Sequence, residues 1–161
     1  MPPPNSTEAT AAAAATAAAA AMLPPPTLQE LTRQAKEAKS KAYCPYSNFR
    51  VGAAVLSQDG ETVTTGANVE NASYPVGTCA ERVALARAVV ETGETRFRAL
   101  AVATDVSPAA SPCGMCRQFI REFGDAGMLI VLVAADDRVE VVTLEQLLPM
   151  SFGPEHLSTR E

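Results

Sequence analysis

Two cysteines three positions apart, directly behind a proline, are the first residues whose spacing suggests chemistry. They are Cys113 and Cys116 in the stretch SPCGMCRQF, and a third cysteine, Cys79, lies upstream in TCAER, two positions before Glu81. The chain has only four cysteines and one histidine. Because thiolates are ligands that zinc binds well in proteins, we take Cys79, Cys113 and Cys116 as candidate zinc ligands.

The number of ligands separates a structural zinc site from a catalytic one. Structural sites are closed by four protein ligands, whereas catalytic sites leave a position open for water. Cys44 is the remaining candidate for a fourth ligand, but it stands alone before Pro45, and we interpret it as a small core residue. We expect the three ligands at the first turns of two helices, where the helix dipole favours the thiolate.

Glu81 has two interpretations. With Thr78 it forms the pattern Thr-x-x-Glu, which is typical of a capping box at a helix start. Two residues after a ligand, it could instead face the open metal position and carry protons. Cys-Ala-Glu followed by Pro-Cys-x-x-Cys matches the signature of zinc nucleobase deaminases, in which the glutamate is the acid/base and cysteine can replace a histidine ligand. We therefore predict that Glu81 is catalytic.

The elements that must position these residues follow from hydrophobic periodicity and turn signals. Thr27 and Glu30 read as a capping box that opens a helix ended by Cys44-Pro45, and Thr78 and Ser111 are expected to cap two further helices. The alternation of helices and strands predicts one mixed sheet covered by helices. The expected strands are 49–57, 62–69, 98–104, 128–134 and 138–142, and the helices after the first are 78–92, 111–123 and 143–148.

Composition limits the domain organisation and the class of partner. The 161 residues, 47% of them hydrophobic, predict a single domain over 27–161 behind an Ala/Pro-rich leader, 1–26, that we expect to be disordered. No basic residue precedes Arg33 and no other run is long enough for a membrane span, so we expect a cytoplasmic location and no membrane partner. A net charge of −5 without a Lys/Arg cluster excludes nucleic acid as an expected partner and favours small neutral ligands.

Three longer segments resemble the small zinc-dependent cytidine deaminases. They are AYCPYSNFRVGAAV, GANVENASYPVGTCAERVAL and SPCGMCRQFIREFG, and the resemblance runs from about Leu28 to Phe152. The resemblance is specific to this family, because it includes segments that are not required for binding zinc. It implies an α/β fold, a three-layer α-β-α sandwich with one mixed five-stranded sheet, with one Zn²⁺ per subunit. It also implies a homotetramer whose sites are completed by neighbouring subunits.

The resemblance also implies a reaction and a set of roles. The reaction is hydrolytic deamination of cytidine and 2′-deoxycytidine to uridine and 2′-deoxyuridine, a step of pyrimidine salvage, in which hydroxide generated at zinc attacks C4 and Glu81 is the proton shuttle. Arg82 would donate to the thiolates and offset their charge. The implied substrate-binding residues are Phe49 against the pyrimidine, Asn68 and Glu70 at the ribose hydroxyls, the Ala80 N–H and the Ser111 carbonyl at the base edge, Phe152 from a neighbouring subunit, and Asn71 and Tyr74 as further candidates.

Several alternatives remain open at this point. A deaminase of blasticidin-type aminonucleoside antibiotics has similar zinc motifs, although the segment Asn-Val-Glu-Asn-Ala-Ser-Tyr-Pro matches the nucleoside loop of the cytidine deaminases. A non-catalytic zinc-binding protein would need a fourth ligand, and a thiol redox protein using Cys113 and Cys116 would leave Cys79 and Glu81 unexplained. An enzyme that edits nucleic acid is disfavoured by the acidic balance. We interpret Arg117 and Arg121 as surface or interface charges.

Overall fold

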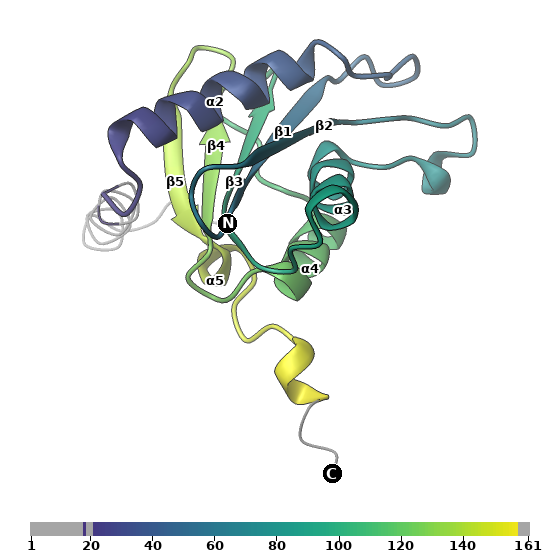
Figure 1. Ribbon diagram of the computed structural model, residues 1–161. Coiled ribbons are helices and arrows are strands. Elements are labelled where there is room, and N and C mark those ends of the chain that lie inside the picture. The colour runs from purple at the N-terminus through teal and green to yellow at the C-terminus, as the bar shows by residue number, and fades with distance from the viewer. Residues whose placement is uncertain (1–17, 19–20, 158–161) are drawn as a thin grey trace, which may run out of the picture.

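A mixed sheet of five strands forms the centre of the computed structural model, which describes residue 18 and residues 21–157 (Figure 1). The strand order is β2-β1-β3-β4-β5, in which β3 and β4 run parallel and the other neighbours antiparallel. This confirms the predicted mixed five-stranded sheet. The strands are β1 (Val51–Ser57), β2 (Val63–Ala67), β3 (Phe97–Thr104), β4 (Leu129–Val133) and β5 (Val139–Thr143).

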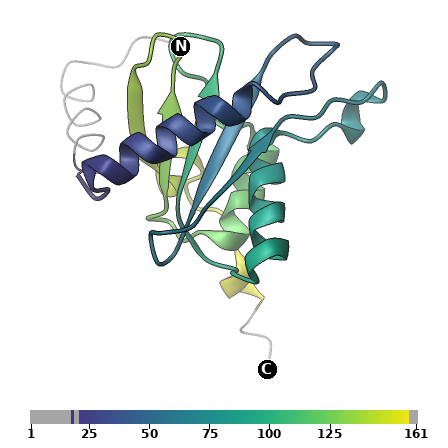
Figure 2. The same ribbon diagram turned by 45° about the horizontal axis from the view of Figure 1, so that its top comes forward.

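Helices cover both faces of this sheet, as Figures 1 and 2 show. Helix α2 (Pro25–Lys39) packs on one face through Leu31 and Ala35. Helices α3 (Ala80–Thr92) and α4 (Gly114–Phe123) pack on the other. The three-layer α-β-α sandwich is thereby confirmed. The remaining helical elements are short: η1 (Tyr74–Val76), α5 (Leu144–Leu147) and η2 (Pro154–His156).

The central strands are apolar on both faces because helices cover both. All five residues of β4 are buried, and so are seven of the eight residues of β3. Such continuous hydrophobic runs are typical of parallel strands inside a layered α/β domain. Along β1, Ala53 and Val55 face the α3/α4 layer while Ala54 and Leu56 face α2. No helix within the described part of the chain is long and apolar enough to cross a membrane.

The predicted helix starts at Thr27, Thr78 and Ser111 are wrong. Helix α2 begins at Pro25, and α3 and α4 begin one residue after Cys79 and Cys113, which are their N-cap residues. None of the three has a side-chain cap hydrogen bond. We predicted each cap from a local sequence pattern. The N-terminal N–H groups of a helix can instead be satisfied by any hydrogen-bond acceptor, including a ligand, so such a pattern does not fix where the helix begins.

Two features at the amino-terminal end also differ from the sequence-based expectation. Glu30, the expected partner in the first capping box, instead binds the guanidinium of Arg33 at 2.7 Å. The first helix ends at Lys39, well before Cys44. The expected disordered leader, 1–26, lies largely outside the described residues, and its division from the domain stays a prediction. Leu23, which lies within that range and is described, packs in the core beneath α2.

Glycine at two positions lets helices approach the sheet closely. A Cβ atom on Gly52 of β1 would lie 2.1 Å from the carbonyl oxygen of Ala35 and 2.2 Å from the amide nitrogen of Lys39, both in α2. On Gly66 of β2 it would lie 2.4 Å from the amide nitrogen of Ala84 in α3. Since these contacts are with helix backbone rather than with movable side chains, the layer spacing on both faces depends on the absence of a side chain.

We predict that Gly52→Ala destabilises the fold by about 3 kcal/mol or more, because the methyl group would force α2 away from β1. Urea unfolding followed by circular dichroism would show a lower midpoint at an unchanged m-value. Gly127→Ala is the matched control, since its Cβ would meet nothing nearer than 3.4 Å. Equal midpoints for Gly52→Ala and Gly127→Ala would contradict this account of the packing.

Candidate metal centre

The three predicted zinc ligands lie together at the N-terminal ends of α3 and α4. The Sγ atoms of Cys79, Cys113 and Cys116 all lie within 4.8 Å of one another. Cys79 and Cys113 are the N-cap residues of the two helices, and Cys116 is buried in the first turn of α4. A tetrahedral zinc ion with Zn–S distances of about 2.3 Å needs sulfurs roughly 3.8 Å apart. The cluster therefore fits zinc in both ligand chemistry and spacing.

Cys44 does not belong to this cluster. Of the His, Cys, Asp and Glu side chains at residues 18 and 21–157, only the three cysteines form a group close enough to share a metal ion. A closed site with four protein ligands is therefore not formed by the described residues, which disfavours the alternative of a purely structural zinc protein.

Hydrogen bonds link the thiols of the cluster. Cys116 donates a hydrogen bond to Cys79, and this bond, together with one from Arg82, lowers the pKa of the Cys79 thiol. The pKa of Cys116 is raised, because Cys116 supplies that proton and is itself buried. Crowded thiols cannot all ionise beside one another unless a cation joins them. Binding of a divalent metal would release the remaining protons, since only thiolates are ligands.

Arg82 contacts the sulfur cluster from α3, as the sequence predicts. Burial opposes its charge, but hydrogen bonds and attraction to Cys79 raise the pKa of its guanidinium above the usual value. Its Nη2 also donates to the carbonyl of Gly77 at 3.2 Å. Arg82 thus connects the cysteines to the segment that precedes them, and its position agrees with the predicted charge-compensating role, which stays a prediction.

Glu81 is buried beside the cysteines and forms no capping box with Thr78. Its side chain is 4% exposed, and burial raises the pKa of its carboxyl, with the nearby Cys79 charge adding to the shift. Hydrogen bonds from its own backbone N–H and from Cys116 act in the opposite direction. Since α3 lacks a side-chain cap, the capping-box interpretation is wrong. The carboxyl lies against the thiols, where it can exchange protons with a group bound there.

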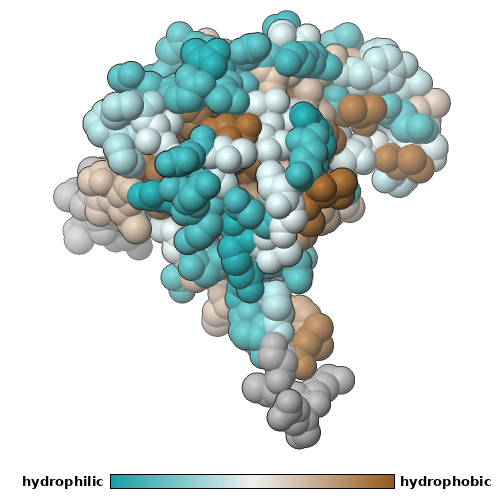
Figure 3. Space-filling view, viewed as in Figure 1, coloured by the Kyte–Doolittle hydropathy of each residue, from teal (hydrophilic) through white to brown (hydrophobic). Residues whose placement is uncertain are grey.

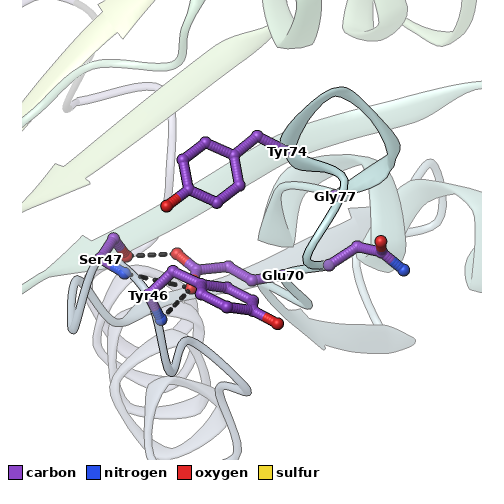
Figure 4. A pocket seen from close by; sticks show the side chains of 6 residues that line it. Tyr46, Ser47, Glu70, Tyr74 and Gly77 are labelled. Atoms are coloured by element: carbon purple, nitrogen blue, oxygen red, sulfur yellow. Dashed lines mark hydrogen bonds between the residues drawn. The ribbon is translucent and has the colours of Figure 1, made fainter.

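A cavity of about 280 Å³ lies beside the segment that leads into α3 (Figure 4). Two segments form its walls, one before β1 and one between β2 and α3. The rings of Tyr46 and Tyr74 pack against each other at these walls, tilted by 50° with centroids 5.6 Å apart. Because Arg82 binds both Gly77 and Cys79, the cavity wall is connected to the sulfur cluster. The lining residues are Tyr46, Ser47, Glu70, Asn71, Tyr74 and Gly77.

Glu70 is held in this cavity by the segment before β1. One carboxylate oxygen accepts from the backbone N–H groups of Tyr46 at 2.9 Å and Ser47 at 3.2 Å, and the other accepts from the Ser47 hydroxyl (Figure 4). The Ser47 hydrogen bond is the largest cause of a lowered pKa for the Glu70 carboxyl. Glu70 is therefore an ionised acceptor at neutral pH, as a role at sugar hydroxyls requires.

Asn68 and Phe49 are joined by a hydrogen bond at the start of β1. The Asn68 amide donates to the carbonyl of Phe49 at 2.9 Å and accepts from the N–H of Val51 at 2.8 Å. Asn68 is buried, and Phe49 is partly buried. Their predicted contacts with substrate stay predictions, but the structure gives both residues a place in one hydrogen-bonded network next to Glu70.

The other predicted substrate-binding residues occupy different environments. Ala80 is fully buried at the first position of α3, where backbone N–H groups have no partner within the helix. Asn71 and Tyr74 are exposed in the cavity wall, and Ser111 is exposed just before α4. Phe152 stacks on His156. Of the predicted substrate-binding residues, Phe152, Phe49, Asn68, Ala80 and Ser111 are not among those that line the cavity.

Two arginines of α4, which we interpreted as surface or interface charges, instead bind within the chain. Arg117 donates to Pro112 O at 2.7 Å, to Leu147 O at 2.6 Å and to Ser111 Oγ at 2.8 Å. Arg121 donates to Ser151 Oγ at 2.9 Å and pairs with Glu155. Together they fix the carboxy-terminal segment against α4. No sequence signal marked the contacts with the carboxy-terminal segment, because Leu147 and Ser151 each lie 30 residues from the arginine that binds them.

Comparison with known proteins agrees with this geometry. Residues 25–132 match the family model described as the cytidine and deoxycytidylate deaminase zinc-binding region. A cytidine deaminase of Sporosarcina psychrophila is 44% identical over 131 residues, which cover 81% of this chain and 95% of that protein. The cytidine deaminase of Halalkalibacterium halodurans is 42% identical over 130 residues, 81% and 97% of the two chains. A crystal structure of cytidine deaminase from Burkholderia pseudomallei superposes with a TM-score of 0.73 at 43% identity, covering 77% of this chain and 98% of that one.

We predict that Cys113→Ala loses most of its bound zinc, because two thiolates hold a zinc ion much less tightly than three. Inductively coupled plasma mass spectrometry of purified protein would measure zinc per chain. Cys44→Ala is the matched control and should keep the wild-type zinc content, since Cys44 lies outside the cluster. Zinc loss in Cys44→Ala, or full zinc content in Cys113→Ala, would show that the ligand set is wrong.

Proposed function

Since the chain belongs to the cytidine and deoxycytidylate deaminase family, we propose that it catalyses the hydrolytic deamination of cytidine and 2′-deoxycytidine to uridine and 2′-deoxyuridine. The observation that carries this proposal is the buried carboxyl of Glu81 beside three thiols that share one metal position. In this arrangement Cys79, Cys113 and Cys116 hold the zinc ion and Glu81 moves the protons.

The reaction needs an activated water and two proton transfers. When bound by the three thiolates, zinc supplies Lewis acidity that lowers the pKa of a water from 15.7 towards roughly 7. Glu81 accepts one proton of this water and passes it to ring N3 as the C4–O bond forms. Glu81 then carries the second proton to the exocyclic amine, the C4–N bond breaks, and ammonia leaves. The burial of Glu81 supports this role, because a carboxyl shielded from bulk water exchanges protons with the substrate.

The charge of the metal centre is balanced by groups around it. Three thiolates and a divalent ion carry a formal charge of −1, which weakens the ion as a Lewis acid. The guanidinium of Arg82, bonded to Cys79, and the N-terminal ends of α3 and α4 supply positive potential at the sulfurs. Arg82 therefore supports the reaction without touching substrate.

The cavity beside the segment that leads into α3 is the proposed nucleoside site. The ionised carboxylate of Glu70 and the amide of Asn68 bind the sugar hydroxyls, and the ring of Phe49 packs on the pyrimidine. The Ala80 N–H and the Ser111 carbonyl read the base edge, while Asn71 and Tyr74 complete the wall. The support for these roles is the shared network of Asn68 and Glu70 with the segment before β1.

A homotetramer with sites completed by neighbouring subunits is the proposed assembly. Hydrophobic side chains are exposed on the projecting segment that carries η1 and on the carboxy-terminal segment (Figure 3). Tyr74 is 73% exposed and Phe152 is 57% exposed. Exposed aromatic side chains of this kind are enriched at protein interfaces. Phe152 lies on a segment fixed to α4, which suits it to enter the cavity of a neighbour.

The proposed setting is pyrimidine salvage in the cytoplasm. The four cysteines of the chain are all free thiols in the structure. A cluster of reduced thiols that must bind metal is maintained in a reducing compartment, which supports this location.

We predict that Glu81→Gln lowers kcat for cytidine by about 10² to 10⁴ or more while zinc per chain stays at the wild-type value, because the amide cannot carry protons. The loss of the cytidine absorbance band, followed beside a zinc measurement, tests both parts. Near-normal turnover by Glu81→Gln would contradict the assigned role. If the wild type converts a blasticidin-type aminonucleoside but leaves cytidine unchanged, the proposed substrate is wrong.

We predict that Phe152→Ala raises KM for cytidine without changing zinc content, because the missing ring belongs to a neighbour's site. Steady-state kinetics and the mass measured by analytical ultracentrifugation test this together. Leu157→Ala is the matched control, since Leu157 has the same 57% exposure and lies in the same segment. An unchanged KM in Phe152→Ala would remove this residue from the site.

A further inference from the structure

Ser47 connects the backbone before β1 to the carboxylate of Glu70. Its Oγ accepts from the N–H of Phe49 at 3.0 Å and donates to Glu70 Oε1. Its own N–H donates to Glu70 Oε2 at 3.2 Å. Figure 4 shows Ser47 beside the carboxylate at the edge of the cavity. Ser47 is exposed and lines the cavity, so this arrangement is not explained by packing in the core.

These bonds leave Glu70 with little spare acceptor capacity. An ionised carboxylate offers about four lone-pair sites. Oε2 accepts from the N–H groups of Tyr46 and Ser47, and Oε1 accepts from the Ser47 hydroxyl. Counted this way, about one site on Oε1 remains free for a ligand. Glu70 can therefore accept from one sugar hydroxyl and not from two.

Asn68 has a matching limitation. Its Oδ1 accepts from the N–H of Val51, and one of its two amide hydrogens is donated to the carbonyl of Phe49. One N–H donor of the amide is left. A hydroxyl group has one hydrogen to donate and lone pairs to accept. One free acceptor on Glu70 and one free donor on Asn68 thus complement a single hydroxyl.

We propose that Ser47 is a specificity-determining positioning residue, which occupies one acceptor site of Glu70 so that the enzyme reads only one of the two hydroxyls of the sugar. This inference rests on the proposed function of the cavity as a nucleoside site. On this account, the enzyme accepts a nucleoside that lacks one sugar hydroxyl because of the Ser47 side chain, which contacts Glu70 and acts through it.

Removal of the Ser47 hydroxyl should allow Glu70 to bind both hydroxyls of the sugar. In Ser47→Ala the acceptor site on Oε1 that the Ser47 hydroxyl occupies is released, and because Ser47 lines the cavity, that site opens towards the ligand. The second sugar hydroxyl then gains a hydrogen bond to a charged group, and such a bond changes affinity by about tenfold or more. A general loosening of Glu70 would weaken cytidine and the tolerated deoxynucleoside alike, because both carry the hydroxyl that Glu70 binds, and it would cancel in their ratio.

The test is the kcat/KM of cytidine, 2′-deoxycytidine and 3′-deoxycytidine for wild type and Ser47→Ala. We expect the wild type to use one deoxynucleoside within about threefold of cytidine and the other at least about tenfold less well, which is the value of one hydrogen bond to a charged group. In Ser47→Ala the tolerated deoxynucleoside should fall by about tenfold relative to cytidine. Zinc per chain should stay unchanged.

Two further variants separate positioning from a general structural effect. Ser47→Thr keeps a hydroxyl on the same atom and should restore the wild-type ratios. In a Glu70→Ala background, the change Ser47→Ala should leave the ratios unaltered, because the two residues act as one unit.

The results also separate this inference from the proposed function. A wild type that deaminates no cytidine overturns both. If the wild type deaminates cytidine but both deoxynucleosides are equally poor or equally good, the single-hydroxyl account fails alone. The same holds if Ser47→Ala keeps the wild-type ratios, or if Ser47→Thr behaves like Ser47→Ala.

Discussion

The meeting of two helix N-termini is the constraint on which the rest of this molecule depends. Helices α3 and α4 lie on the same face of the sheet, and each has a cysteine at its N-cap, where a hydroxyl or carboxylate side chain is more usual. The sulfurs therefore lie at the N-terminal ends of both helices. Because helix N-termini favour negative charge, the fold prepares three thiols for a cation before any cation binds. The glycines of β1 and β2 set the distance between the sheet and the helices that cover it.

Arg82 links the sulfur cluster to the residues around it. Arg82 binds Cys79 and also the carbonyl of Gly77, so one guanidinium connects the sulfur cluster to a wall of the cavity. Glu81, directly before Arg82 in the same helix, is buried against the sulfurs and has a raised pKa. A metal ligand, a buried carboxyl and a contact to the cavity wall thus come from neighbouring residues at the start of α3, while the other two thiols come from the start of α4. A change in the start of α3 would disturb all three together.

The nucleoside side of the site is built from backbone groups as much as from side chains. Glu70 is oriented by N–H groups of Tyr46 and Ser47, and Asn68 is oriented by the backbone around Phe49. Polar groups that are fixed by the scaffold need no reorganisation when a ligand arrives. The same bonds use part of the hydrogen-bonding capacity of Glu70 and Asn68. The backbone groups that orient these two side chains therefore also limit how many further partners each can bind.

Much of this protein follows from the sequence by itself. Apolar runs gave the strands to within a few residues, and the spacing of Cys79, Cys113 and Cys116 with Glu81 identified the metal centre, because ligand chemistry and helical spacing are local properties. The tertiary structure decided where the helices begin and how the polar side chains are used. Thr78 and Ser111 have the residue types of caps, yet the cysteines hold those positions. The anchoring by Arg117 and the bond from Ser47 to Glu70 join segments more than twenty residues apart, and such contacts are set by the packing of the layers rather than by any pattern in the chain.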